Sequence, residues 1–181
     1  DQEMLDRIVA AMDFYCKAQG EGGGFLGPAL PRKDVNWPTW LGGPNRKKGH
    51  HGLEVGQYYL YKAFHLVFDD LQSRGMLEKA IDHDLNPDTP KIARKDAYAA
   101  MLKRSYEKTS KNVLNRSIAN QIIHNYLPAY TINKALLALC PEKAVPDAEL
   151  ERLAEMAAGV RRHPQWGHYA YSPKGMPLED G

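Results

Sequence analysis

Apolar residues recur at helical spacing through most of the chain. The clearest case is the first stretch, where side chains at three- and four-residue intervals predict an amphipathic helix that ends at Gly20. The predicted helices cover residues 2–19, 52–72, 73–84, 91–109 and 148–160. Asp147 is expected to cap the last of them. No alternating pattern of any length precedes the tail, 161–181, where short strands are expected. The pattern predicts an all-α protein of consecutive antiparallel helices with long loops.

The longest helical pattern, residues 115–140, has an unusual polar content. It carries no charged residue between Arg116 and Lys134. Its uncharged polar residues are Asn120, Gln121, His124, Asn125 and Asn133. A helix with an ordinary solvent-exposed face would carry Lys and Glu there. The uncharged polar side chains therefore indicate a face that lines a cleft. The alternative is an internal polar network that ties the helix to its neighbours.

Two details narrow that hypothesis. Asn120, Gln121 and His124 lie within one turn of each other, so they are neighbours on the helix surface. Amides hydrogen-bond a carboxylate without titrating, and a histidine exchanges a proton near neutral pH. Pro128 is expected to kink or split the helix near Tyr126. The candidate site is therefore confined to residues 115–125.

The composition limits the classes of protein to which this chain can belong. The 181 residues, 43% of them apolar and 25% charged, fit a single domain over residues 1–181 with a sizeable core. The net charge of +2 does not point to nucleic acid, and no apolar run approaches a membrane span. The chain opens on Asp1 without a signal peptide, so we expect a processed, trimmed or fragmentary chain. Cys16 and Cys140 are expected to be two unpaired core cysteines, although a disulfide between them stays open.

The loop before the second helix combines cations with aromatic residues. Arg46, His50 and His51 belong to the segment NRKKGHH, and Trp37 and Trp40 precede it. Cations pair with carboxylate or sulfate, and an indole stacks on a sugar ring, so the loop suits a charged sugar chain. A plain solvated loop is the alternative.

The histidines do not indicate a metal. The spacing of His50, His51 and His65 matches no zinc pattern, so no metal site and no cofactor is expected. We expect His65 to be a satisfied core histidine. The segment HPQWGHYAY is a further candidate, because it gathers Trp166, Tyr169 and Tyr171 in a loop. Aromatic packing of a chain end is its alternative.

Three stretches carry a resemblance to a known family. They are AQGEGGGF after the first helix, NRSIANQIIHNYLPAYTINKAL, and HYAYSPKGMPLEDG at the end. Together they resemble the (α/α)-toroid polysaccharide lyases, the heparinase-, chondroitinase- and alginate-lyase-like enzymes. In that family a catalytic tyrosine tends to follow a segment like GMPLEDG, and a toroid has more helices than are predicted here. The resemblance therefore implies a truncated part of a larger toroid.

The resemblance implies cleavage of an acidic, uronic-acid-containing polysaccharide by β-elimination, in a secreted or periplasmic protein. The implied catalytic residues are Asn120, Gln121, His124, Tyr169 and Tyr171. The implied substrate-binding residues are Trp37, Trp40, Arg46, His50, His51, Arg116 and Trp166.

Two other functions stay open. A glycoside hydrolase on the same toroid needs two carboxylic acids that flank the bond. Its candidates are Glu54, Asp69, Asp70 and Glu179, which the sequence does not place as a pair. The third possibility is a non-catalytic helical module that binds a glycan or a protein.

Overall fold

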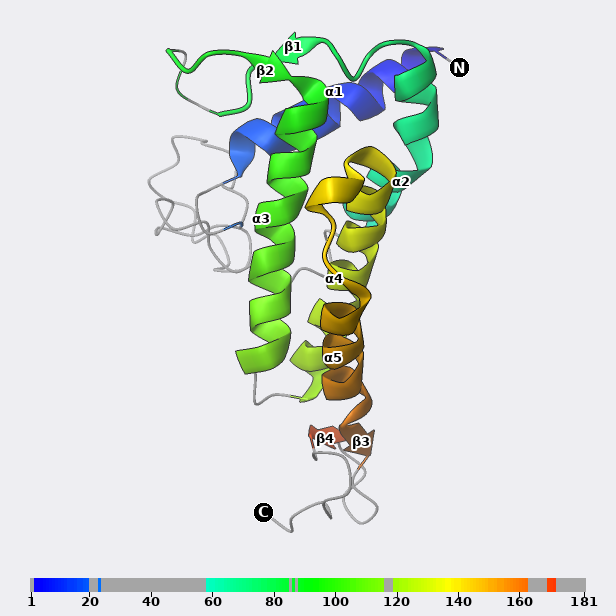
Figure 1. Ribbon diagram of the computed structural model, residues 1–181, viewed down its shortest axis with the longest axis vertical. Helices are drawn as coiled ribbons and strands as arrows, with labels where there is room; N and C mark the ends of the chain where they lie inside the picture. The colour runs from blue at the N-terminus through cyan, green and yellow to red at the C-terminus, as the bar shows by residue number, and fades with distance from the viewer. Residues whose placement is uncertain are drawn as a thin grey trace, which may run out of the picture.

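The computed structural model describes residues 2–19, 23, 58–84, 86, 88–115, 119–162 and 169–171. These residues form five α-helices and two small antiparallel sheets, so the all-α prediction is confirmed (Figure 1). The helices are α1 (Gln2–Ala18), α2 (Tyr58–Ser73), α3 (Arg94–Asn115), α4 (Ala119–Leu139) and α5 (Asp147–Ala158), with a 3₁₀ turn at Pro141–Lys143. The strands are β1 (Ala80–Ile81) paired with β2 (Ile92–Ala93), and β3 (Val160–Arg162) paired with β4 (Tyr169–Tyr171).

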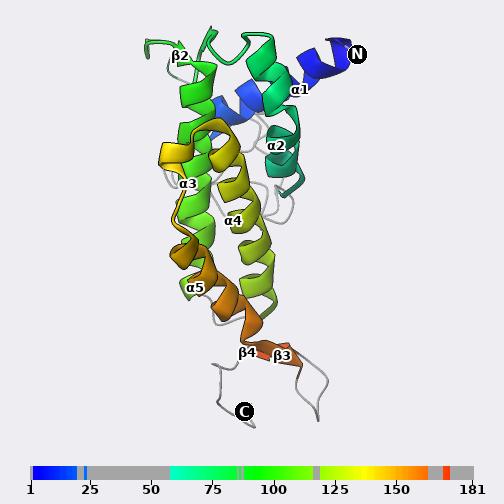
Figure 2. The ribbon, with the colours of Figure 1, turned by 45° about the vertical axis from the view of Figure 1, so that its right-hand side comes forward.

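Helix α4 is the centre of the arrangement. It lies antiparallel to α3 along the long axis and also contacts α2 and α5 (Figures 1 and 2). Helix α1 crosses the start of α3 at one end of the molecule, and β3 and β4 lie at the opposite end. A helix with three helical neighbours must be apolar on several sides, which explains why α4 has few charged residues.

The core confirms the predicted inner face of α1. Leu5, Val9, Met12 and Cys16 are buried in one hydrophobic cluster with residues of α2, α3 and α4. Within the same cluster Phe64 of α2 packs edge-on against Tyr98 of α3, with ring centroids 5.0 Å apart. The residues expected to point inward on the helix over 91–109 are Ile92, Ala99, Leu102 and Tyr106. Ala99, Leu102 and Tyr106 are buried on α3, whereas Ile92 is half-buried and lies in β2.

The helix predicted over 73–84 is wrong. Helix α2 ends at Ser73, and Gly75 follows with a φ of +63°, in the left-handed region that favours glycine. The N–H of Met76 then donates to the carbonyl of Leu71 at 2.9 Å, which closes the helix end. The chain continues into β1, so a turn and a strand, instead of a helix, bury the apolar side chains of this segment.

The proline in α4 does not split the helix. α4 is a single helix from Ala119 to Leu139, with Pro128 buried inside it. A proline removes one helical hydrogen bond and crowds the preceding turn. Packing of α4 against α2, α3 and α5 offsets that local cost, because tertiary burial supplies most of a helix's stability in a protein.

Two predictions about single residues are also wrong. The N-cap of α5 is Pro146, and Asp147 is already the first helical residue and makes no side-chain cap. Asp147 and Glu149 still place acid in the first turn, where it complements the helix dipole. His65 is exposed, because it follows buried Phe64 by one position and the helix turns it away from the core.

Candidate functional site

Two segments that carry predicted catalytic residues meet at one end of the molecule. The first two turns of α4 hold Asn120, Gln121 and His124, and β4 holds Tyr169 and Tyr171. Helix α4 begins at the end where α3 finishes, and the β3–β4 ribbon lies at this same end and contacts α4 (Figures 1 and 2). The backbone therefore brings together two segments that are distant in the sequence. The side chains of these five residues lie outside what the structure describes.

The other polar residues of α4 belong to the core. Asn125 and Asn133 are both buried. The side-chain oxygen of Asn133 accepts the N–H of Val145 at 2.8 Å, and its amide nitrogen donates to the carbonyl of Val145 at 3.4 Å. This pair holds the connection between α4 and α5 against α4. For Asn125 and Asn133 the cleft interpretation is wrong, because a buried amide serves the packing of the helix.

The predicted substrate-binding residues cannot be located on the fold. Trp37, Trp40, Arg46, His50, His51, Arg116 and Trp166 all lie outside the described residues. Their binding role therefore stays a prediction. Among the carboxylates considered for a hydrolase, Asp69 and Asp70 are exposed on α2, whereas Glu54 and Glu179 lie outside the described residues.

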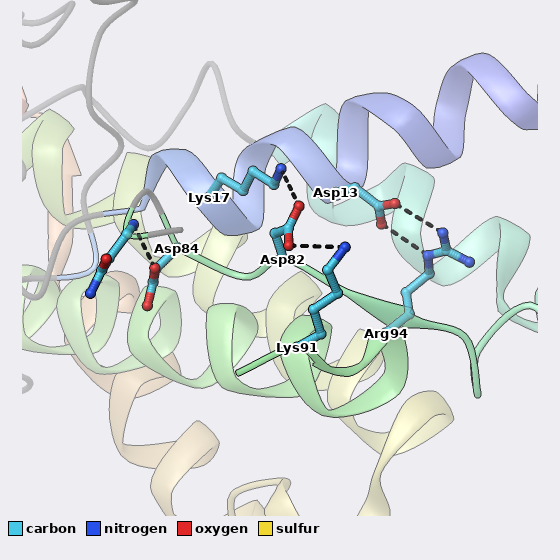
Figure 3. A network of polar contacts seen from close by, with 7 residues as sticks. Asp13, Lys17, Asp82, Asp84, Lys91 and Arg94 are labelled. Atoms are coloured by element: carbon cyan, nitrogen blue, oxygen red, sulfur yellow. Dashed lines mark hydrogen bonds and ion pairs between the residues drawn. The ribbon is translucent and has the colours of Figure 1, made fainter. Parts of the chain in front are cut away.

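A buried ion pair that sequence reasoning missed joins α1 to α3. Asp13 accepts hydrogen bonds from Nε and Nη2 of Arg94, both at 2.9 Å (Figure 3). It also accepts a hydrogen bond from the hydroxyl of Tyr98 at 2.7 Å. Arg94 also donates from Nη1 to the carbonyl of Met76 at 2.6 Å. The guanidinium is therefore held by a bidentate carboxylate and a backbone oxygen, the geometry that compensates best for burial of a charge.

The electrostatics of this cluster follow from burial. Burial, followed by the hydrogen bond to Asp13, raises the pKa of Tyr98 far above its usual value. Burial is also the main cause that raises the pKa of Cys16 to about 12. The hydrogen bond to Asp13 raises the pKa of Arg94. All three groups therefore stay protonated at neutral pH, as expected of groups buried in a structural cluster.

Cys16 and Cys140 are both buried and free, which confirms the prediction of two unpaired core cysteines. Burial raises the pKa of Cys140 as well, and its thiol donates to a carboxylate oxygen of Glu142 at 2.6 Å. A protonated, buried thiol is a poor nucleophile. Neither cysteine therefore qualifies as a catalytic residue.

One glutamine, Gln19, joins Gly23 to α3. The amide nitrogen of Gln19 donates to the carbonyl of Gly23 at 3.2 Å, to the carbonyl of Met101 at 3.0 Å and to the hydroxyl of Ser105 at 2.8 Å. Its side-chain oxygen accepts Nε–H of Arg104 at 2.7 Å. Both ends of the amide are therefore engaged, which fixes its orientation and that of the arginine.

A second set of charges near α1 lies at the surface. Asp82, just after β1, pairs with Lys17 at 3.0 Å and with Lys91 at 3.3 Å (Figure 3). The hydrogen bond from Lys17 is the main cause that lowers the pKa of Asp82. All three side chains are exposed to solvent by more than a third, so these pairs contribute little to stability.

Comparisons with known proteins identify no relative of this chain. No protein-family model, curated protein or solved structure matches the chain. Within the described part of the chain, no group of three or more His, Cys, Asp and Glu residues could hold a metal ion. None of the described helices is both long enough and apolar enough to cross a bilayer.

Proposed function

We propose that this chain is part of an (α/α)-toroid lyase that cleaves an acidic, uronic-acid-containing polysaccharide by β-elimination, in a secreted or periplasmic protein. The observation that carries the proposal is the meeting of the first turns of α4 with β4 at one end of the helices. These are two of the three stretches on which the resemblance to polysaccharide lyases rests. They supply the two kinds of residue that the reaction needs.

The reaction assigns a role to each candidate. Asn120 and Gln121 donate hydrogen bonds to the uronate carboxyl group, which stabilises the charge that develops when the neighbouring C5 proton is removed. His124 accepts that proton. The C5–H electron pair forms the C4=C5 double bond while the C4–O bond breaks. Tyr169 or Tyr171 gives its proton to the leaving oxygen, so the step needs no water and no redox partner.

The substrate chain needs a surface beyond these five residues. In the proposal, Trp37 and Trp40 stack on sugar rings, and Arg46 and Arg116 pair with acid groups of neighbouring sugars. An extended binding surface of this kind aligns the scissile bond with the proton-transfer groups, which is a large part of the rate gain in such a site.

The test compares two histidines. His124→Ala is expected to lower the turnover of the protein that carries this chain by about 100-fold or more, the usual range for loss of a general base. His65→Ala is the matched control, because His65 is an exposed histidine on α2. The assay offers a panel of acidic polysaccharides and follows the ultraviolet absorbance of the unsaturated uronate product. Circular dichroism checks that both variants fold.

Two results would refute the lyase. One is the absence of any absorbance rise with the whole panel, and the other is equal turnover in His124→Ala and the wild type. The glycoside-hydrolase alternative predicts new reducing ends without the unsaturated product, so a reducing-sugar assay on the same samples separates the two reactions.

A non-catalytic binding module is the second candidate. Leu127, Tyr130 and Leu137 of α4 are 47%, 37% and 48% exposed, and their spacing places them on one side of the helix. An exposed apolar face on a central helix favours contact with another protein surface. A binding module keeps its affinity in His124→Ala, whereas in a lyase the same variant loses turnover.

A further inference from the structure

Helix α1 lies at the edge of the helical arrangement. It crosses the start of α3 at one end of the molecule, and among the described helices it contacts mainly α3 (Figures 1 and 2). Helix α4, in contrast, lies among α2, α3 and α5. Proteins open locally in cooperative units, and the units with the fewest contacts open at the lowest cost. Departure of α1 would therefore leave the packing of α4 against its neighbours intact.

The contact of α1 with its neighbours is in large part polar. Asp13 and Lys17 point from α1 towards Arg94 and Asp82 (Figure 3). Gln19, one position past the end of α1, adds hydrogen bonds to α3. These groups exchange protein partners for water when α1 leaves, so their net contribution to docking is small for their number. The polar part of the contact therefore adds little to the free energy that keeps α1 in place.

Asp13 nevertheless controls docking, because Arg94 is buried beneath α1. The Arg94 side chain is 4% exposed, and its guanidinium donates to both carboxylate oxygens of Asp13 at 2.9 Å. When α1 leaves, water reaches both charges, and the cost of burying them is recovered. When Asp13 is removed, Arg94 is left buried without its counter-ion only while α1 is docked. Loss of the carboxylate therefore shifts the equilibrium towards an open form.

Apolar burial opposes this opening. Leu5, Val9, Met12 and Cys16 are buried on one side of α1, so the open form exposes them to water. An undocked helix of 17 residues is also marginal by itself, because tertiary packing supplies most of the stability of a helix in a protein. The open form is therefore a small minority, in which the amides of α1 lose their helical hydrogen bonds.

We propose that α1 is a strap that opens from α3 as a unit while α2 to α5 stay folded, with the Asp13–Arg94 pair as its latch. This opening is a conformational device of the fold and does not depend on the proposed function. It uncovers the buried face of α1 and, on α3, the hydroxyl of Tyr98, which donates to Asp13 at 2.7 Å in the closed form. These groups become available to another molecule only in the open form.

The test is hydrogen exchange of the full chain, read by mass spectrometry at a series of urea concentrations below the unfolding midpoint. The conditions are chosen so that opening and closing are fast relative to exchange, and circular dichroism gives the global unfolding of the same samples. In the wild type, the amides of α1 are expected to exchange with a weaker urea dependence than global unfolding has, since opening of one helix exposes less surface. Asp13→Ala is expected to raise the exchange rate of these amides in water by about 100-fold, because it removes one partner of a buried pair.

Two control variants separate the strap from global unfolding. Leu153 is buried on α5, which contacts α3 and α4 and extends towards the end of the molecule opposite α1 (Figures 1 and 2). Leu153→Ala is expected to raise the global unfolding constant by about 30-fold or more and to leave the exchange rate of α1 unchanged. Asp82→Ala removes an exposed carboxylate that pairs with Lys17, and it is expected to change the exchange rate of α1 by less than about threefold.

Each outcome decides for or against the strap. A weak urea dependence of α1 exchange, faster exchange in Asp13→Ala and an unchanged rate in Leu153→Ala support it. The strap is overturned if the amides of α1 follow global unfolding in urea, or if Leu153→Ala accelerates them by its whole loss of stability. It is also overturned if Asp13→Ala exchanges at the wild-type rate, because the pair would then not be a latch. If Asp13→Ala fails to fold, the wild-type urea series and Leu153→Ala still decide.

Discussion

Removal of the Asp13 carboxylate is the sharpest test of what holds α1 to α3. In Asp13→Ala, the guanidinium of Arg94 keeps only the carbonyl of Met76, and the hydroxyl of Tyr98 loses its acceptor. The Arg94 side chain is 4% exposed, so water replaces the lost carboxylate poorly. The variant therefore leaves a charged group buried without its counter-ion.

The structure sets the size of the effect. Breaking a buried pair by removing one partner costs about 3–5 kcal/mol. The Asp13 side chain is 23% exposed, which lets some water reach the arginine and places the cost near the lower end of that range. The variant is expected to lose about 3 kcal/mol of its free energy of unfolding, a large part of the total for one domain. The melting temperature is expected to fall by about 10 °C for a chain of this size.

Urea and thermal unfolding measure this change, and a neighbouring carboxylate is the control. Asp82→Ala removes an aspartate whose side chain is 47% exposed and paired with Lys17 and Lys91, so its melting temperature is expected to stay close to that of the wild type. The double variant Asp13→Ala/Arg94→Met is expected to recover stability, since it removes the unpaired charge. The reasoning fails if Asp13→Ala has the same melting temperature as Asp82→Ala, or if the double variant is no more stable than Asp13→Ala.

Three further predictions concern single positions. Gly23→Ala is expected to destabilise the protein by about 2 kcal/mol in urea unfolding, because its methyl group would lie 2.3 Å from a backbone oxygen of α3. Gly75→Ala is the comparison: its methyl group meets open space, so only backbone strain of about 1 kcal/mol is expected. Asn133→Ala leaves the buried N–H of Val145 without its acceptor and is expected to cost about 2 kcal/mol, and an unchanged urea midpoint would contradict that hydrogen bond. Burial raises the pKa of Cys16 from near 9 to about 12, so the thiol ionises at lower pH in the unfolded chain than in the folded one. The free energy of unfolding is therefore expected to fall as pH rises from about 9 towards 12. Ellman's reagent at pH 8 is expected to react with Cys16 only after unfolding.

Part of the candidate site could be found from local pattern alone. The uncharged polar run in α4 and the aromatic tail stand out by composition, and nothing but residue type is needed to notice them. Their meeting at one end of the helices could not be read from the chain, because it depends on α5 returning antiparallel to α4. The sequence alone also does not distinguish Asn120 from Asn133, because both are uncharged polar residues of the same helix. The fold distinguishes them, because it brings Val145 beside Asn133, where the N–H of Val145 donates to the Asn133 side chain.

The sequence by itself determined the helices whose apolar residues repeat at helical spacing. Leu5, Val9, Met12 and Cys16 line one face of α1, and burial of that face is a local consequence of the helical period. The same is true of the free cysteines, which behave as small apolar residues. These features follow from neighbours within a few positions along the chain.

Only the tertiary structure decided which polar residues enter the core and which apolar ones remain outside. Asp13 and Arg94 are ordinary charges in the sequence and become a buried pair because α1 crosses the start of α3. Pro128 stays inside one helix because α4 has neighbours on several sides that stabilise it. These outcomes depend on contacts between residues far apart in the chain, and the free energy of such contacts outweighs the local preference of the residue.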